Sequence, residues 1–307
     1  MSDKLKSNIG AQSSEPHFDE TPPPPFSSRI NVDFYGMSEK GLVRSNNEDH
    51  FLLVRVGRAV ETVLTNLSED ETMPGELFEE SGYGMVLADG VGGEAAGEVA
   101  SRKAIYTLLS LVLHTPDWQF RWSSKEKNTV MWRMKDRFRH VNDALIRYAA
   151  ADSRLRGMCT TLTAAVIYGN GLIIGHIGDS RAYLLHGGKL MKVTRDHTVG
   201  ERLVEEGTHA PGDPLVVELR GLLLKALGAK QGECEPDVYD CQLENNDQLL
   251  LCTDGLTDMV ADAAIETIMN GATSAESACR KLVDQALSNG GRDNVTVIVA
   301  RYSAPAA

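Results

Sequence analysis

Short apolar runs alternate with longer segments in which apolar residues recur every three or four positions, and this pattern predicts a mixed α and β domain. Tight glycine-containing turns at residues 168–171 and 186–189 join neighbouring short runs, which favours antiparallel hairpins over a parallel sheet. The predicted strands cover residues 33–38, 50–56, 84–88, 159–168, 171–177, 182–186, 189–193, 248–252 and 295–301.

Apolar residues at helical spacing predict the helical part of the domain. The first helix is marked by Ala96, Val99, Ala100 and Ile105, and the second by Met134, Phe138, Val141, Leu145 and Tyr148. Two further helices are predicted at residues 258–270 and 274–289. Many antiparallel strands with four or five helices predict the α+β class.

The chain is divided into a tail and one domain. Residues 1–29 are polar and include the run Pro22 to Pro25, so a disordered tail is expected, and residues 30–303 form the domain. Residues 57–82 hold seven acidic residues against one arginine and are expected to form a solvated loop insertion. Residues 197–225 begin with the helix cap Thr198-x-x-Glu201, and a mobile cover beside a site and a plain surface loop both fit them.

Composition narrows the possible partners. A net charge of −12 opposes nucleic-acid binding, which needs a basic surface, but it can concentrate cations. The chain lacks an apolar run of about 18 residues and an apolar signal-peptide core, so we expect no membrane contact and a cytoplasmic location. A monomer is the expected oligomeric state. The five cysteines form no Cys-x-x-Cys pair, which fits reduced structural thiols.

Acidic residues recur where predicted strands meet turns. Three strands run into an aspartate followed by a turn residue, at Asp89-Gly90, Asp179-Ser180 and Asp254-Gly255, while Asp293 and the pair Glu48-Asp49 precede two others. Any one Asp-Gly is ordinarily a β-turn. If these five strand ends converge, their carboxylates would repel one another unless cations neutralise them, and oxygen ligands without His or Cys favour Mg²⁺ or Mn²⁺.

Six motifs follow one another in a characteristic order. They are Arg44-x-x-x-Glu48-Asp49, Ala88-Asp-Gly-Val-Gly-Gly93, Thr160-Thr-Leu-Thr163, Gly178-Asp-Ser-Arg181, Thr253-Asp-Gly-Leu-Thr-Asp258 and Arg292-Asp-Asn-Val-Thr296. Together they resemble the metal-dependent protein phosphatases of the PPM, or type 2C, family in its bacterial style, over residues 31 to 302. The resemblance implies two packed antiparallel sheets flanked by helices, with a binuclear site at one end. It also implies hydrolysis of phosphoserine and phosphothreonine on proteins without a phosphoenzyme.

The resemblance implies a role for each motif residue. Asp89 would bridge two Mn²⁺ or Mg²⁺ ions and Gly90 would bind one through its carbonyl, while Asp254 and Asp293 would bind the other. Glu48 and Asp49 would hold metal-bound waters, Asp179 would help to bind a weaker third ion, and Arg44 would bind the substrate phosphate. The expected catalytic residues are therefore Arg44, Asp89 and Asp254. Residues 197–225 take the place of the family's flap. The implied partners are phosphoprotein substrates and a cognate Ser/Thr kinase in signalling.

Alternatives remain open at several positions. Arg44 also fits a buried structural ion pair. Val91 stands where many eukaryotic members carry a histidine that is the proposed general acid. A metal-bound water is therefore the preferred proton donor, with His50 and His197 as alternatives. Residues 90–95 fit the dinucleotide pattern G-x-G-x-x-A, which would require a parallel sheet. A regulatory phosphoprotein-binding module and a nucleic-acid phosphoesterase are the remaining readings.

Overall fold

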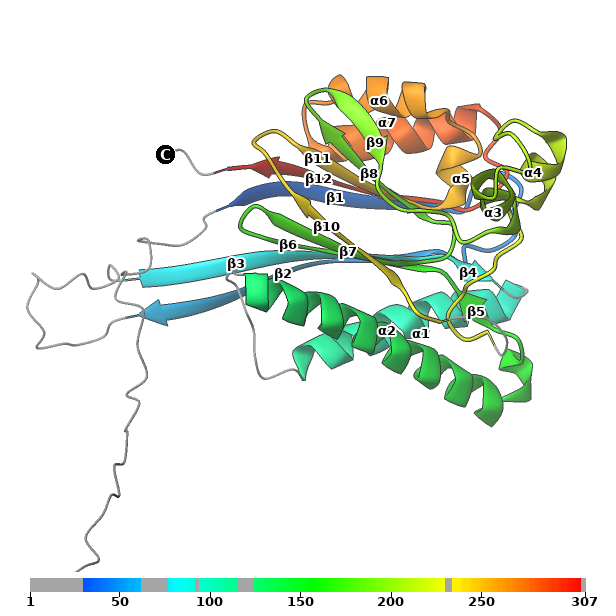
Figure 1. The fold of residues 1–307 in the computed structure, drawn as a ribbon, viewed down its shortest axis with the longest axis horizontal. Coiled ribbons are helices and arrows are strands. Elements are labelled where there is room, and N and C mark those ends of the chain that lie inside the picture. Colours follow the sequence, from blue (N-terminus) through cyan, green and yellow to red (C-terminus); the bar gives the residue numbers. More distant parts are fainter. Residues whose placement is uncertain (1–29, 62–76, 92–93, 115–123, 230–233, 305–307) are drawn as a thin grey trace, which may run out of the picture.

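Two five-stranded β-sheets stack face to face, and helices cover the outer face of each (Figure 1). The structure is a computed structural model that describes residues 30–61, 77–91, 94–114, 124–229 and 234–304. Every strand pair in these ranges is antiparallel. The expected α+β sandwich is confirmed, and the dinucleotide interpretation is wrong because the described strands form no parallel unit.

The two sheets differ in the parts of the chain that they use. One has the order β1 (Asn31–Glu39), β12 (Val295–Ser303), β11 (Gln248–Cys252), β8 (Arg181–His186) and β9 (Lys189–Lys192). The other has the order β10 (Asp237–Gln242), β7 (Gly171–Ile177), β6 (Leu162–Tyr168), β3 (Leu77–Ala88) and β2 (His50–Glu61). A short pair, β4 (Gly90–Val91) with β5 (Cys159–Thr160), continues from the second sheet.

Alternation along the strands builds three apolar layers. Met85 and Leu87 of β3 face the core between the sheets, whereas Val86 and Ala88 face α1 (Glu94–Leu113) and α2 (Ser124–Ala151). On the other side, α6 (Asp262–Asn270) and α7 (Ala275–Ser288) cover the first sheet. Both helical layers were predicted from helical spacing, although the helix expected at 258–270 begins four residues later, as α6, and the short helix α5 (Asp254–Thr257) before it was not predicted.

Several expected boundaries were wrong. The loop expected over 57–82 is shorter, because β2 and β3 stay paired from His50 with Ala88 out to Glu61 with Leu77. Its remainder, 62–76, and the tail 1–29 lie outside the described residues. The sequence reading also missed β10, since its half-buried sequence DVYDCQ is interrupted by polar residues, and it merged β5 with β6.

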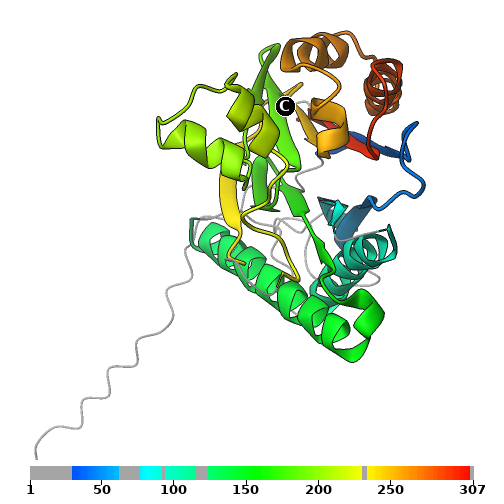
Figure 2. The ribbon, with the colours of Figure 1, turned by 90° about the vertical axis from the view of Figure 1, so that its right-hand side faces the viewer.

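The 197–225 segment packs as two short helices at the end of the sandwich where α5 lies (Figure 2). The predicted cap is confirmed, since Thr198 Oγ1 accepts a hydrogen bond from the Glu201 N–H at 3.1 Å at the start of α3 (Val199–Glu205). Asp213 caps α4 (Pro214–Leu219) in the same way. In the described part of the chain, no helix has the length and apolar character needed to cross a membrane.

Candidate metal centre

The acidic residues singled out from the sequence lie next to the ends of strands that meet at one end of the sandwich, and Figure 1 shows β4 and α5 at this end. Asp89 joins β3 to β4, Asp179 lies in the turn between β7 and β8, and Asp254 begins α5 directly after β11. Asp293 precedes β12, and Glu48 and Asp49 precede β2. The sheet topology thus brings together side chains that are up to about 240 positions apart in the sequence.

The carboxyl groups perturb one another strongly. Burial, followed by the charges of Asp49, Asp254, Asp179 and Asp293, raises the pKa of Asp89 well above its ordinary value. Burial and the charges of Asp179 and Asp293 raise the pKa of Asp254 in the same way. Such buried, mutually repelling carboxyls are favourable in their ionised form only beside a positive charge.

Asp49 provides a direct test of whether a cation fits here. Burial raises the pKa of Asp49 to about 6, even though its Oδ2 accepts hydrogen bonds from Thr296 Oγ1 at 2.8 Å and Thr253 Oγ1 at 3.0 Å. Among the described residues, its other oxygen, Oδ1, is buried and meets no hydrogen-bond donor. Asp89 is its direct neighbour. A buried acceptor without a donor, within a set of hard oxygen ligands, fits Mg²⁺ or Mn²⁺.

Threonine hydroxyls hold the Asp89 backbone in place. The Asp89 carbonyl accepts hydrogen bonds from Thr160 Oγ1 at 2.7 Å and from the Thr161 N–H at 2.9 Å. The Asp89 N–H in turn donates to Thr161 Oγ1 at 3.0 Å, and Thr161 Oγ1 also contacts Ser180 Oγ at 2.9 Å. The Thr160-Thr161 pair therefore fixes the strand end that carries Asp89 and joins it to the turn that carries Asp179.

Glycines allow α1 to approach this strand end closely. A Cβ atom on Gly90 would lie 2.2 Å from the Gly97 carbonyl oxygen, and one on Gly97 would lie 2.1 Å from Glu48 Oε2. Neither position has room for a side chain. The two glycines thus place the first turns of α1 against the peptide of Gly90 and the carboxylate of Glu48.

Arg44 and Asp293 are paired with each other. Arg44 Nη2 donates to Asp293 Oδ2 at 2.6 Å, while Asp293 Oδ1 accepts from the Asn294 N–H at 2.8 Å. The Arg44 side chain is 57% exposed, so the idea that it is buried was wrong, whereas the ion-pair reading is confirmed. In the described residues no three His, Cys, Asp or Glu side chains are arranged so that they could hold a metal ion by themselves.

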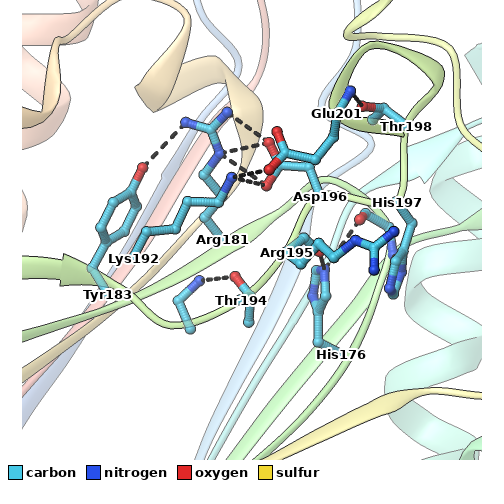
Figure 3. A network of polar contacts seen from close by, with 12 residues as sticks. His176, Arg181, Tyr183, Lys192, Thr194, Arg195, Asp196, His197, Thr198 and Glu201 are labelled. Carbon is cyan, nitrogen blue, oxygen red and sulfur yellow. Dashed lines mark hydrogen bonds and ion pairs between the residues drawn. The ribbon is translucent and has the colours of Figure 1, made fainter. Parts of the chain in front are cut away.

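The turn that carries Asp179 is held on both sides by the residues that lead into α3. On one side the His197 N–H donates to the Gly178 carbonyl at 2.7 Å, and the Gly178 N–H donates to His197 Nδ1 at 3.1 Å. On the other, Figure 3 shows the Arg181 guanidinium facing Asp196, with Nη2 to Oδ2 at 2.7 Å and Nε to Oδ2 at 2.9 Å. The dipeptide Asp196-His197 therefore sets the position of Asp179.

Lys192 extends the network to the first turn of α3. Its Nζ lies 3.0 Å from Asp196 Oδ1 and 3.6 Å from Glu201 Oε1 (Figure 3). Burial, followed by the charge of Asp196, raises the pKa of Asp179 to about 7. Asp179 thus joins the group of carboxyls that are favourable as ions only beside a cation.

A family model described as Protein phosphatase 2C matches residues 70–289, which is most of the domain. The chain belongs to the protein phosphatase 2C family. The serine/threonine protein phosphatase PstP of Mycobacterium tuberculosis is 36% identical over 263 residues, covering 86% of this chain and 43% of PstP. This chain therefore spans less than half the length of PstP. The serine/threonine phosphatase Stp of Listeria welshimeri is 33% identical over 215 residues, covering 70% of this chain and 82% of Stp.

The fold of this protein phosphatase 2C domain agrees with that of solved relatives. The crystal structure of the PstP catalytic domain, in complex with two manganese ions, matches with a TM-score of 0.68 and 32% identity, over 89% of this chain and 99% of that one. The sandwich of two antiparallel sheets with outer helices is thus the fold of the family.

The two histidines considered as proton donors, His50 and His197, are held by contacts within the protein and have lowered pKa values. Burial lowers the pKa of His50, whose Nδ1 contacts Ser101 Oγ at 2.9 Å. Burial also lowers the pKa of His197, whose Nδ1 accepts a hydrogen bond from the Gly178 N–H and whose Nε2 lies 3.1 Å from Asp237 Oδ2. A lowered pKa keeps the neutral imidazole at pH 7, which is the wrong form for a proton donor.

Sequence reasoning named the acidic residues of the protein phosphatase 2C site but missed several that support them. Thr160, Thr161 and Asn294 were noted within motifs without a role, and Gly97 and Asp196 were not singled out. Their function is to support neighbouring backbone and carboxylates. Only the motif around Thr160 contained a usable signal, because a threonine pair directly before an apolar strand can donate two hydroxyls to a neighbouring strand end.

Proposed function

We propose that this chain removes phosphate from phosphoserine and phosphothreonine residues of proteins, using two Mg²⁺ or Mn²⁺ ions. The observation that carries the proposal is the group of buried carboxyls around Asp89, which raise one another's pKa. Family membership and the two manganese ions reported for the PstP catalytic domain support it.

The proposed ligands are those that the family resemblance implies. Asp89 would bridge the two ions, the Gly90 carbonyl would bind one, and Asp254 and Asp293 would bind the other. When bound, the two ions supply positive charge that lowers the pKa of water for attack on phosphorus and neutralises phosphoryl oxygens. Asp179 would contribute to a weaker third site.

The remaining groups would orient water and substrate. Asp49, fixed by Thr253 and Thr296, and Glu48, fixed against Gly97, would accept hydrogen bonds from water beside the ions. Arg44 would leave Asp293 and donate to two oxygens of the substrate phosphate, because a guanidinium matches two phosphate oxygens. With Val91 after Gly90, water would protonate the leaving serine or threonine oxygen.

Attack by water requires no phosphoenzyme. All five cysteines are free thiols, and burial raises the pKa of Cys159, which makes it a poor nucleophile near neutral pH. Free thiols also fit a reducing, cytoplasmic location, where a Ser/Thr kinase would supply the phosphoproteins that a monomeric phosphatase would act on.

The test is release of phosphate from a phosphothreonine peptide by purified protein in EDTA, Mg²⁺ and Mn²⁺. We expect metal-dependent release that is lost in Asp89→Asn and Asp254→Asn. Metal binding without turnover would instead indicate a regulatory phosphoprotein-binding module. Recovery of a covalent phosphoenzyme after a denaturing quench would contradict direct attack by water.

A further inference from the structure

Two large apolar side chains stand directly beside the candidate phosphate-binding residue. Leu42 and Val43 are each 69% exposed and immediately precede Arg44 in the loop between β1 and β2. Single exposed apolar residues are common on proteins and need no explanation. An adjacent pair next to the residue that would hold the phosphate is a candidate for contact with the substrate.

The backbone of this loop is fixed against the segment that carries Asp293. Gly41 has a φ of +78°, and a Cβ atom there would lie 2.2 Å from the Asp293 carbonyl oxygen, so only glycine fits. The Leu42 N–H donates to the Gly291 carbonyl at 2.7 Å. The direction in which Leu42 leaves the loop is therefore set by backbone contacts and not by burial of its side chain.

One side chain ties both ends of the loop together. Asn294 Nδ2 donates to the Lys40 carbonyl and to the Asn46 carbonyl, each at 2.8 Å. Asn294 Oδ1 accepts from the Glu48 N–H at 2.8 Å. Leu42 and Val43 are thus presented to solvent on a preorganised loop, which reduces the entropy lost when a partner binds to them.

We propose that Leu42 and Val43 form a recognition site for apolar residues that directly flank the phosphorylated residue of a protein substrate. This inference rests on the proposed function and specifies its substrate class. Leu42 and Val43 lie within two residues of Arg44, and an extended chain advances about 3.3 Å per residue, so residues that flank a phosphoresidue held by Arg44 would pass near this pair. The contact removes apolar surface from water and favours substrates with apolar flanks.

The experiment compares a phosphopeptide with a substrate that has no flanking residues. The first substrate is a phosphothreonine peptide with leucine on both sides of the phosphothreonine, the second is the same peptide with serine in place of leucine, and the third is p-nitrophenyl phosphate. The variants are Leu42→Ser and the isosteric Val43→Thr. The control is Leu113→Ser, which alters a leucine that is 61% exposed at the far end of α1 from Gly97.

We expect Leu42→Ser to lower kcat/KM for the leucine-flanked peptide by about tenfold, and Val43→Thr by a smaller factor, through KM with kcat unchanged. Rates on p-nitrophenyl phosphate and on the serine-flanked peptide should stay within about twofold of wild type. Leu113→Ser should change none of them.

Equal losses on all three substrates would overturn the inference, because the pair would then position catalytic groups and not recognise flanking residues. Unchanged rates on the leucine-flanked peptide would also overturn it. If the wild type shows no metal-dependent hydrolysis of p-nitrophenyl phosphate or of either peptide, the proposed function itself fails.

Discussion

The Arg44–Asp293 ion pair gives the most specific prediction, because it joins two residues that are assigned to different ligands. Arg44 Nη2 lies 2.6 Å from Asp293 Oδ2, and this bond is the largest cause of the raised pKa of Arg44. A metal ion on Asp293 would compete with Arg44 for that carboxylate, and a phosphate on Arg44 would draw the guanidinium away from Asp293. Arg44→Ala should therefore have opposite effects on the two ligands.

The size of the expected change in Mn²⁺ affinity follows from how exposed the side chains of Arg44 and Asp293 are. The two side chains are 57% and 34% exposed, and ion pairs of this kind contribute roughly 0.2–1 kcal/mol. Removing Arg44 should therefore tighten Mn²⁺ binding by up to about fivefold, since 1.4 kcal/mol corresponds to a factor of ten. Loss of the guanidinium should at the same time raise KM for a phosphopeptide, with a smaller effect on kcat.

The assays are calorimetric titration with Mn²⁺ and steady-state kinetics on a phosphothreonine peptide. Arg44→Lys should recover part of the effect on Mn²⁺ binding but little of the effect on KM, because an ammonium cannot bind two phosphate oxygens in a fixed plane. Arg280→Ala is the matched control, since Arg280 pairs with Glu276 on α7 and is 55% exposed. Unchanged KM together with weaker Mn²⁺ binding in Arg44→Ala would refute the reasoning.

Three further predictions concern stability, measured by urea denaturation in EDTA unless stated. Thr253→Val and Thr296→Val should each lower the free energy of unfolding by about 1–3 kcal/mol, since each removes a donor from buried Asp49, and an unchanged midpoint would contradict this. Asp179→Asn should stabilise the metal-free protein by relieving repulsion between carboxylates, while it reduces turnover. Asp196→Asn should destabilise the protein by about 3 kcal/mol, because it breaks the ion pair with Arg181. An Asp179→Asn variant less stable than Asp196→Asn would exclude the proposed role of Asp196 in holding the Asp179 turn. The folded-state pKa values of Asp49 and Asp179 are raised to about 6 and about 7, so the native state binds more protons than the unfolded state. The free energy of unfolding should therefore be highest at low pH and should fall as pH rises from about 4 to about 7. Saturating Mn²⁺ should remove this slope, and a slope unaffected by Mn²⁺ would count against the site.

Much of the fold was predictable because its strands are apolar on both faces. Gly171–Ile177 and Gln248–Cys252 are buried throughout, and their predicted bounds are confirmed. The edge strand β10 was missed because burial patterns weaken where one side of a strand faces solvent. The lengths of β2 and β3 depend on pairing with each other, which no local pattern contains.

The sequence was enough to predict the acidic residues of the site, but not the side chains that hold those residues in place. Asp89, Asp179 and Asp254 each end a recognisable strand, so the sequence marks them directly. The contacts of Asp196 with Arg181 and of Asn294 with Lys40 depend on tertiary structure. The pairing of Arg44 with Asp293, 249 positions apart, is of the same kind.

The central claim is that carboxylates from separate strands form one site for two divalent cations. Equilibrium titration of the metal-free protein with Mn²⁺ tests it most directly, with Asp89→Asn titrated in parallel. We predict about two strongly bound ions per chain in the wild type, and loss of strong binding in Asp89→Asn, because that carboxylate would be shared by both ions. Wild-type protein that binds no Mn²⁺, or an Asp89→Asn variant that binds it as the wild type does, would contradict the account.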